Sequence, residues 1–300
     1  MTGQTSGQAK NLRFEIVLLF VLAGLWGSSY LFIKIAVVTI PPLTLIAIRV
    51  SIAAGFLYTV MKLQGHKLPR DSKTWKMLLL QSFLNSIGAW TVLAWGQQYV
   101  DSGLASVLNS TSPIFVFFFT LLFTRHESTG LLKLFGAFLG LFGVVLIMGA
   151  DALAGIGQMV YAQLAILLGA VMYAGAAIYG KNLSHLPATV TACATMMWAS
   201  LVLIPASIVL DQPWSLQPSS QSLAAALALA VFCTGIALMI YFRLLHTLGS
   251  IGTASQAYLR AGIGVGLGVI FLGEQITLVL GIGLFAAVLG VAAINYPQQG

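Results

Sequence analysis

The sequence predicts an all-α membrane protein in which ten transmembrane helices form two inverted five-helix repeats around a central cavity. The first observation behind this prediction is composition, since 59% of the 300 residues are hydrophobic and only 7% are charged, whereas a soluble domain carries about a quarter charged residues. The second is an internal repeat, because much of the first half of the chain returns roughly 147 to 149 positions later. The third is a set of apolar segments that divides equally between the two halves.

The repeat is clearest in the segment from Gly103 to Ile147, whose small, polar and acidic residues recur in the same order near the end of the chain. Self-similarity at half the chain length indicates a duplicated unit, and in an apolar chain it is typical of transporters built from two repeats. The identical pairs include Gly103 and Gly252, Ala105 and Ala254, Ser106 and Ser255, Ile114 and Ile263, Glu127 and Glu274, Gly136 and Gly283, and Gly143 and Gly290.

A transmembrane helix needs about 20 consecutive apolar residues. We expect spans at 14–34, 41–62, 75–98, 103–124, 130–149, 160–181, 187–210, 221–246, 251–272 and 276–295. Five spans per copy is an odd number, so the second copy must lie upside down relative to the first. The predicted parts of the chain are a tail at 1–13, a first repeat at 14–149, a second repeat at 150–295 and a tail at 296–300.

Charged residues predict the orientation in the membrane. The excess of Lys and Arg, which gives a formal net charge of +7, follows the rule that cytoplasmic loops are basic. It therefore indicates topology and not a nucleic-acid partner. We therefore expect both termini to lie in the cytoplasm. The basic set is Lys10, Arg13, Lys62, Lys67, Arg70, Lys73, Lys76, Arg125, Lys133 and Lys181, and the other connections carry mainly Asp101, Asp151, Asp211 and Glu274, with Lys34 as the exception.

From Trp26 the chain reads WGSSYLFIKIAVVTIPPLTLIAIR, and this resembles the opening of the EamA domain of the drug/metabolite transporter superfamily. The segment from Ala105 to Pro113, Glu127 and the later LGEQIT are similar to that family as well. The resemblance covers nearly the whole chain, and its length and aromatic content look most like bacterial aromatic amino acid exporters of the YddG type. It implies a ten-helix carrier of the inner membrane that exports metabolites by alternating access.

Two features depart from the family pattern. Pro113 in the fourth span has Gly262 at the equivalent place in the second repeat, and we interpret both as hinge or kink positions. Small multidrug relatives carry an embedded glutamate in their first span, whereas Glu15 lies at the very start of this one. This position argues against the same proton coupling.

The third span carries a polar and aromatic stripe at helical spacing, which includes Asn85 and Trp95. A polar stripe in a membrane should face protein or a water-filled cavity, because lipid cannot satisfy it. One interpretation is a cavity wall in which Asn85 is a polar contact and Trp95 a stacking surface. The other is helix packing with local hydrogen bonds.

The fourth span places Ser106, Asn109 and Pro113 on one face. Proline frees a carbonyl one turn earlier, so this face is either a half-site for a zwitterion or a kink satisfied by its own side chains. The ninth span carries Gln256, Tyr258 and Arg260. An intramembrane arginine costs about 2.5 to 3.5 kcal/mol on insertion scales, and Arg260 either binds a substrate carboxylate or caps a broken helix.

A further aromatic and polar patch is predicted from Trp26 and Ser29 in the first span and Tyr173 in the sixth. Tyr241 in the eighth span aligns with Val92 of the stripe in the third span. Packing is the alternative for each of them. The substrate-binding set predicted from sequence is therefore Trp26, Ser29, Asn85, Trp95, Ser106, Asn109, Tyr173, Tyr241, Gln256, Tyr258 and Arg260.

These residues predict a carrier that exports small metabolites, most of all amino acids with apolar or aromatic side chains. The alternative is an exporter of drugs or cationic compounds, which a buried acid would favour. We expect no enzyme, no metal and no cofactor, because the four histidines are scattered over connections. The expected partners are the small-molecule substrate and the lipid bilayer, and a homodimer is left open.

Overall fold

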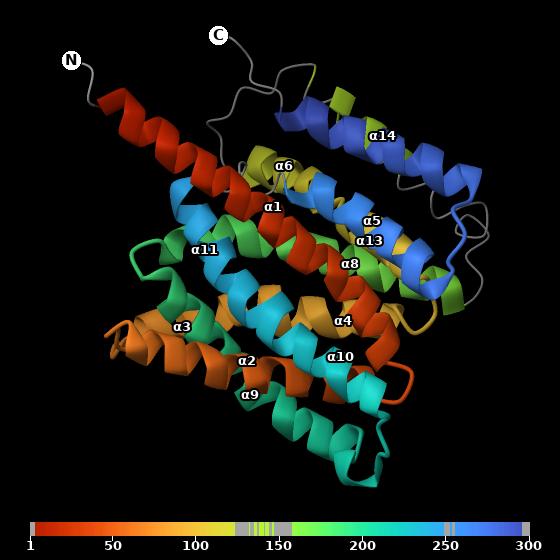
Figure 1. The fold of residues 1–300 in the computed structure, drawn as a ribbon. Coiled ribbons are helices and arrows are strands. Elements are labelled where there is room, and N and C mark those ends of the chain that lie inside the picture. The colour runs from red at the N-terminus through yellow and green to blue at the C-terminus, as the bar shows by residue number, and fades with distance from the viewer. Residues whose placement is uncertain are drawn as a thin grey trace.

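The computed structural model describes residues 4–123, 158–248 and 256–295, with isolated positions between 132 and 146 and at 253. Within these residues the chain is helical and contains no strand, as the sequence predicts. Figure 1 shows the helices running roughly alongside one another, with α14 at one edge of the bundle. The expected fifth span, 130–149, lies mostly outside the described residues.

The first half of the chain supplies four of the expected spans, two of which are divided. Helix α1 covers Gln4–Ala36 and α2 covers Pro42–Leu63. The third span consists of α3 (Ser72–Ser82), a π-helical turn η1 (Phe83–Ile87) and α4 (Gly88–Gly96). The fourth consists of α5 (Ser102–Asn109) and α6 (Ser112–Phe123).

The second half follows a similar order. Its long helices are α8 (Gln158–Gly180) and α9 (Ala188–Leu210), with short 3₁₀ turns η2 (Lys181–Leu183) and η3 (Pro213–Ser215) after them. Next come α10 (Ser220–Ala230), a π-helical turn η4 (Val231–Ile236) and α11 (Ala237–Thr247). The last two are α13 (Gln256–Leu272) and α14 (Leu278–Asn295).

Seven helical segments in the described residues are long and apolar enough to cross a membrane. Two shorter apolar helices, Leu259–Leu272 and Leu278–Gly290, follow them. The seven are Arg13–Ala36, Pro42–Leu63, Ser72–Gly96, Ser102–Thr120, Met159–Leu183, Ala188–Leu210 and Ser220–Thr247.

Local sequence explains where several helices begin and end. The Asp71 carboxylate accepts a hydrogen bond from the Thr74 amide at 2.7 Å and caps α3, and Ser219 caps α10 in the same way. Such caps satisfy amides that have no partner within the helix. Gly65 and Gly273 follow α2 and α13 with φ of 73° and 68°. Glycine adopts this left-handed conformation without steric cost, so it ends a helix readily.

The two halves share an unusual backbone feature. Both η1 and η4 interrupt a long helix near its middle, and the turn that begins at Phe83 corresponds to the turn that begins at Val231. A π-helical turn is rare and usually occurs at functional sites. These turns give the repeat seen in the sequence a counterpart in the backbone.

The packing of the helices is also reciprocal. Helices α2 and α9 pack against each other, and α2 contacts α10 as α9 contacts α3. Helix α1 packs on α10 and α11 as α8 packs on α4. Figure 1 shows α1 crossing the middle of the bundle in front of α8. The contacts that these helices make in one half of the chain are thus repeated by the equivalent helices of the other half.

Candidate functional site

Residues from several helices line one internal cavity, which we call the Trp26 cavity. It lies among α1, α6, α8, α11 and α13, and it extends from the middle of these helices toward the ends of α8 and α11. Its free space is about 30 Å³, room for about two water molecules. The lining residues are Trp26, Ser112, Val116, Tyr173, Ala177, Tyr241, Leu245, Thr253, Gln256 and Arg260.

Three aromatic rings form one wall of the cavity. The centroid of the Trp26 ring lies 5.1 Å from that of Tyr241 and 6.5 Å from that of Tyr173. Tilted arrangements at these distances are favourable between aromatic rings. The Tyr173 hydroxyl accepts a hydrogen bond from the Trp90 indole N–H. The sequence placed Trp26 and Tyr173 in one patch, and the structure brings Tyr241 to the same wall.

Arg260 is the charged residue of the lining. It is only 3% exposed, and its Nη2 donates to the Asn109 carbonyl at 2.9 Å while its Nε donates to the Ser110 hydroxyl at 3.3 Å. Asn109 is the last residue of α5, where unpaired carbonyls carry partial negative charge. The guanidinium therefore caps a broken helix and lines the cavity at once, so the two interpretations from sequence do not exclude each other.

The break between α5 and α6 brings polar backbone to the cavity. Pro113 is the second residue of α6, a position where proline fits because the first amides of a helix lack intrahelical partners. The proline thus starts a new helix after a break at Ser110 and Thr111, and it does not bend a continuous one. Ser112 at the start of α6 lines the cavity. This helix end carries partial positive charge.

Two more predicted residues of the fourth span hold the surroundings in place. The Ser106 hydroxyl donates to the Arg260 carbonyl at 3.1 Å, so it joins α5 to α13. The Asn109 amide donates to the Tyr30 hydroxyl at 2.8 Å. Both residues are buried. They contact the element that carries Arg260 and are not among the residues that line the cavity.

Helix α13 contributes one further polar group. Gln256 is 5% exposed, lines the cavity, and its Oε1 has no hydrogen-bond partner among the described residues. The side chain of Tyr258 lies outside the described residues. Helix α13 runs through Gly262 without a break, so the second repeat does not mirror the interruption at Pro113 there. The reason is that glycine keeps the amide that proline lacks.

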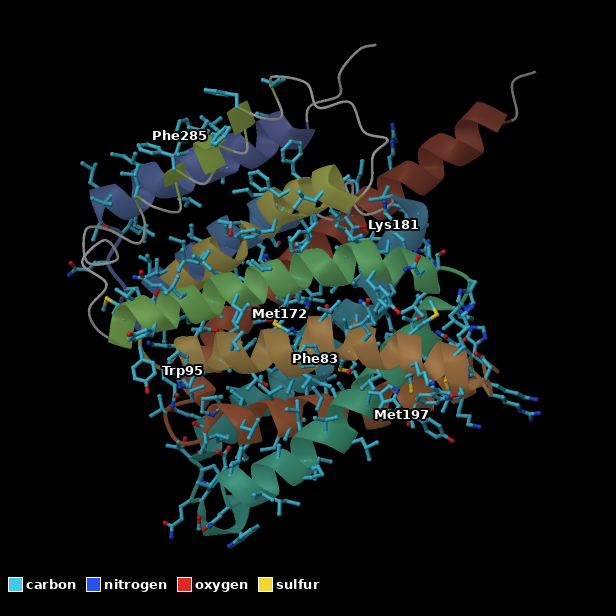
Figure 2. All side chains as sticks on the ribbon, turned by 180° about the vertical axis from the view of Figure 1, so that it is seen from behind. Phe83, Trp95, Met172, Lys181, Met197 and Phe285 are labelled. Atoms are coloured by element: carbon cyan, nitrogen blue, oxygen red, sulfur yellow. The ribbon has the colours of Figure 1, made fainter. Side chains whose placement is uncertain are left out.

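The remaining predicted residues lie elsewhere. Ser29 is buried and donates to the Leu25 carbonyl within its own helix. Asn85 lies in η1, buried, and donates to the Ser86 hydroxyl. Trp95 is 38% exposed and packs edge to face on Tyr99 near the end of α4. Figure 2 shows Trp95 at the side of the bundle, beyond the labelled Met172.

Arg49 is a second buried arginine, and it ends the family-like segment that begins at Trp26. Its guanidinium carbon lies 3.8 Å from the centroid of the Trp90 ring. Its Nε donates to the Thr234 hydroxyl at 2.6 Å, and its Nη2 donates to the Cys233 carbonyl at 3.4 Å. Thr234 and Cys233 belong to η4. The contribution of Trp90 was missed, since no spacing rule relates it to Arg49.

Sequence reasoning also missed an ion pair. Arg243 of α11 donates to the Glu15 carboxylate of α1 at 2.7 Å, and the Thr247 hydroxyl donates to the same carboxylate at 3.1 Å. Glu15 is buried, whereas Arg243 is half exposed. Both were visible in the sequence as charges at span ends, but nothing there showed that the ends meet.

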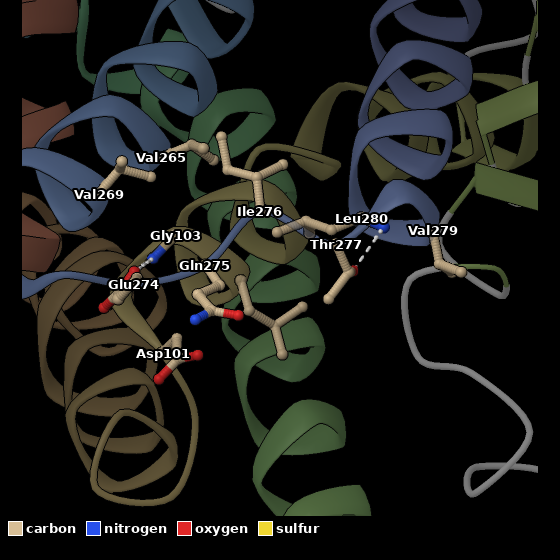
Figure 3. A pocket seen from close by; sticks show the side chains of 11 residues that line it. Asp101, Gly103, Val265, Val269, Glu274, Gln275, Ile276, Thr277, Val279 and Leu280 are labelled. Atoms are coloured by element: carbon tan, nitrogen blue, oxygen red, sulfur yellow. Dashed lines mark hydrogen bonds between the residues drawn. The ribbon is translucent and has the colours of Figure 1, made fainter.

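Charged side chains hold helix ends together at one end of the bundle, which we call the Asp101 end. The Glu274 carboxylate accepts from the Ser102 and Gly103 amides at 2.7 and 2.9 Å, and so caps α5 (Figure 3). Asp211 accepts from the Thr44 amide near the start of α2 at 2.8 Å. Lys34 donates to the Gln97 and Val100 carbonyls after α4 at 3.2 and 2.6 Å.

Two further pockets lie at the same end. One, beside Glu274 and Gln275, has a free space of about 150 Å³. Figure 3 shows Glu274 and Gly103 on one side of it and Thr277, Val279 and Leu280 on the other. The other lies between Lys34, Asp101 and Ser219 with about 380 Å³. Neither includes a residue of the Trp26 cavity. Across the described part of the chain, no three His, Cys, Asp or Glu side chains gather as metal ligands do.

Comparison with known sequences defines the class. The sequence pattern of the EamA-like transporter family matches this chain twice, over residues 13–149 and 160–296. The chain therefore belongs to the EamA-like transporter family and is a membrane transporter. The family resemblance predicted from the WGSSY segment and the LGEQIT segment is confirmed.

Individual relatives agree with this class. The chain is 30% identical over 275 residues to the uncharacterized inner membrane transporter YedA of Escherichia coli K12, covering 90% of this chain and 88% of the relative. It is 25% identical to the uncharacterized transporter YoaV of Bacillus subtilis, covering 89% and 91%. A crystal structure with 18% sequence identity superposes with a TM-score of 0.68 over 94% of this chain and 97% of the other. That likeness concerns the fold alone.

Proposed function

We propose that this protein exports amino acids with apolar or aromatic side chains from the cytoplasm by alternating access. The observation that carries the proposal is the Trp26 cavity, where one buried arginine faces a wall of three aromatic rings. Arginine matches a carboxylate in charge and geometry. Aromatic rings provide an apolar surface for the side chain of the substrate.

The proposed architecture has ten spans in two inverted repeats, with both termini in the cytoplasm. The double match of the family pattern supports the duplication, and so do the equivalent π-helical turns η1 and η4. Under this orientation the Asp101 end faces outward and the Trp26 cavity extends toward the cytoplasm. Inverted repeats place substrate sites near the midplane, where helices are interrupted, and the break between α5 and α6 fits this rule.

The described conformation is closed around the cavity. Its free space of about 30 Å³ is far below the roughly 300 Å³ at which small-molecule sites begin. The helices must therefore move apart to admit a substrate. Toward the Asp101 end, the contacts made by Lys34, Asp211 and Glu274 tie helix ends together. We propose that these contacts hold the outer side closed.

Uptake into liposomes tests the function. The purified full-length protein is reconstituted, and the flux of labelled phenylalanine, leucine, glutamate and lysine is measured against protein-free liposomes and against a cationic dye. We expect flux of phenylalanine and leucine above the protein-free background, and little flux of lysine or the dye. Transport of the dye without transport of any amino acid would instead establish the cationic-compound exporter.

A further inference from the structure

The charges around the Trp26 cavity are unbalanced. Arg260 contributes a positive charge, and the other nine lining residues are aromatic, apolar or neutral polar. None of the carboxylates that the structure describes lines this cavity. Each of them bonds to another group or lies at a helix end away from the cavity. Glu15 pairs with Arg243, Asp71 caps α3, Asp101 lies at the end of the bundle, Asp211 bonds to Thr44, and Glu274 caps α5.

This imbalance affects the two charged groups of an amino acid differently. An α-amino acid carries its ammonium and its carboxylate on the same carbon, so a carboxylate bound to Arg260 holds the ammonium close to the guanidinium. Like charges repel strongly where water is excluded. The carboxylate gains a charged partner in the cavity, whereas the ammonium brings a second positive charge to a site that already has one.

The neutral acceptors do not compensate for this. The Oε1 of Gln256 is buried and unpartnered among the described residues, and it lines the cavity. This oxygen has two lone pairs that can accept hydrogen bonds from a substrate N–H or O–H group, but it carries no charge. An ammonium has three N–H donors and a full charge, and burial of a charge without a countercharge is costly. A hydroxyl group in the same position would be satisfied by this single acceptor.

We infer that the protein recognises the carboxylate of its substrate and not the amine, and that it carries monocarboxylates with an apolar or aromatic body whether or not they have an α-amino group. The inference rests on the proposed carboxylate contact of Arg260. The start of α6 at Ser112, in the wall of the same cavity, adds partial positive charge. A flat ring would pack on Trp26 and Tyr241.

Three ligands that share a phenyl ring separate the two groups. They are phenylalanine, 3-phenylpropionate, which lacks the amine, and 2-phenylethylamine, which lacks the carboxylate. Binding to the full-length protein in detergent is measured by calorimetry, and each compound is tested as a competitor of labelled phenylalanine uptake in liposomes. We expect 3-phenylpropionate to bind at least as tightly as phenylalanine, and 2-phenylethylamine to bind about tenfold more weakly or worse.

Variants connect the preference to Arg260. Arg260→Gln should remove the advantage of 3-phenylpropionate over 2-phenylethylamine, and Arg260→Lys should keep it in part. Lys181→Gln, which removes an exposed charge from η2, should leave the preference unchanged. Arg260→Gln could fail to fold because α5 loses its cap. In that case the Arg260→Lys variant and the ligand comparison on the unaltered protein still test whether the carboxylate is recognised.

The outcomes separate this inference from the proposed function. Binding of phenylalanine without binding of 3-phenylpropionate would overturn the inference and leave amino acid export standing. Transport or binding of 3-phenylpropionate alone would support recognition of the carboxylate, overturn the part of the inference that tolerates an α-amino group, and refute amino acid export. Failure of both compounds, or tighter binding of 2-phenylethylamine, would overturn both.

Discussion

Two buried arginines have no carboxylate partner among the described residues, and each lies at an irregular point of the backbone. Arg260 bonds to the carbonyl that ends α5, and Arg49 bonds to the Cys233 carbonyl in η4. Breaks and π-helical turns leave carbonyls outside the regular helical pattern. A guanidinium can satisfy them because it presents several donors in one plane. The irregular backbone and the arginine therefore stabilise each other.

Replacement of Arg49 by lysine tests this dependence. The ammonium cannot stack flat on the Trp90 ring as the guanidinium does at 3.8 Å. It also cannot reproduce both bonds to Thr234 and Cys233 in the same geometry. Stacking of a desolvated cation on a tryptophan is worth about 2 kcal/mol. We expect a lower unfolding temperature in detergent, measured by the loss of monodisperse protein after heating.

Arg243→Lys is the matched control for this experiment. Arg243 is half exposed, and its partner Glu15 can form an ion pair with lysine as well. Because lysine keeps the positive charge beside Glu15 at this half-exposed position, this variant should unfold close to the unaltered protein. Equal unfolding temperatures of the Arg49 and Arg243 variants would contradict the proposed role of Arg49.

At this scale the structure brings only some of the residues predicted from sequence together at the cavity. Trp26, Tyr173, Tyr241, Gln256 and Arg260 were all expected in the cavity and all line it. Periodicity shows which residues share one face of a helix, but it does not show which neighbouring helix that face contacts. That is why Trp95, on the same predicted stripe as Asn85, lies 38% exposed on the side of the bundle.

Helix α4 approaches α8 closely because Gly96 has no side chain. A Cβ atom at this position would lie 2.8 Å from the Ala162 carbonyl oxygen and 2.7 Å from Ile166 Cγ1. The first of these is backbone and cannot move without shifting α8. Small residues that bring two backbones together are typical of helix contacts in membranes.

Gly96→Ala should therefore reduce stability, and overpacking of this kind costs about 1–3 kcal/mol. Gly55→Ala provides the control, since a Cβ atom there would meet nothing within 4 Å and alanine is the better helix former. Thermal unfolding of both variants in detergent is the measurement. A Gly96 variant as stable as the Gly55 variant would show that α4 and α8 can separate freely.

The contact between Glu274 and α5 offers a test of the proposed outer closure. The carboxylate accepts two amide hydrogen bonds and faces the positive end of the helix. Glu274→Gln removes the charge and leaves one oxygen to serve both amides. We expect a cysteine at Val265, which is buried beside Glu274, to react faster with a thiol reagent in this variant.

Asp101→Asn supplies the comparison for the Glu274 variant. Asp101 precedes α5 as well, but its side chain makes no capping hydrogen bond. Its neutralisation should leave the labelling rate of the cysteine at Val265 unchanged. The same increase in both variants would trace the effect to the surface charge and not to the contact with α5.

The positions of the helices could be predicted well, whereas their interruptions could not. Apolar length and flanking Pro, Asp and Gly residues predicted most helix ends to within a few residues, such as 41–62 for Pro42–Leu63 and 187–210 for Ala188–Leu210. The π-helical turns η1 and η4 have no marker in the sequence comparable to proline. They depend on tertiary contacts such as the bond from Arg49 to Thr234, which no single segment contains.

For the molecule as a whole, the proposed inversion of the repeats predicts opposite exposure of two connections. In a variant without Cys193 and Cys233, single cysteines replace Lys67 and Gln212. A membrane-impermeant thiol reagent applied to intact cells should label the cysteine at position 212 only, and lysis should expose the other. Labelling of both positions from the same side would refute an odd number of spans between them.

The distribution of acids also predicts that transport is not coupled to protons through an embedded carboxylate. A coupling acid should lie at the cavity and become accessible from both sides in turn, as buried acids in pumps and transporters do. In the described residues the buried carboxylate of Glu15 is instead held by Arg243 and Thr247 at the start of the first span. Glu274 is engaged with α5 at the opposite end. Asp71, Asp101 and Asp211 also lie at helix ends. Glu127 and Asp151 lie outside the described residues, and the sequence places both in connections between predicted spans.

Export would then follow the substrate gradient, with Arg260 and the ends of α5 and α6 as fixed charges and dipoles. The measurement is substrate flux in liposomes at equal substrate concentration on both sides, with and without an imposed pH gradient and with an ionophore to collapse the membrane potential. We expect no net accumulation in either condition, while labelled substrate exchanges across the membrane. Accumulation driven by the pH gradient, and abolished by neutralising Glu15 or Glu127 without loss of exchange, would identify that residue as the coupling acid and would refute passive transport.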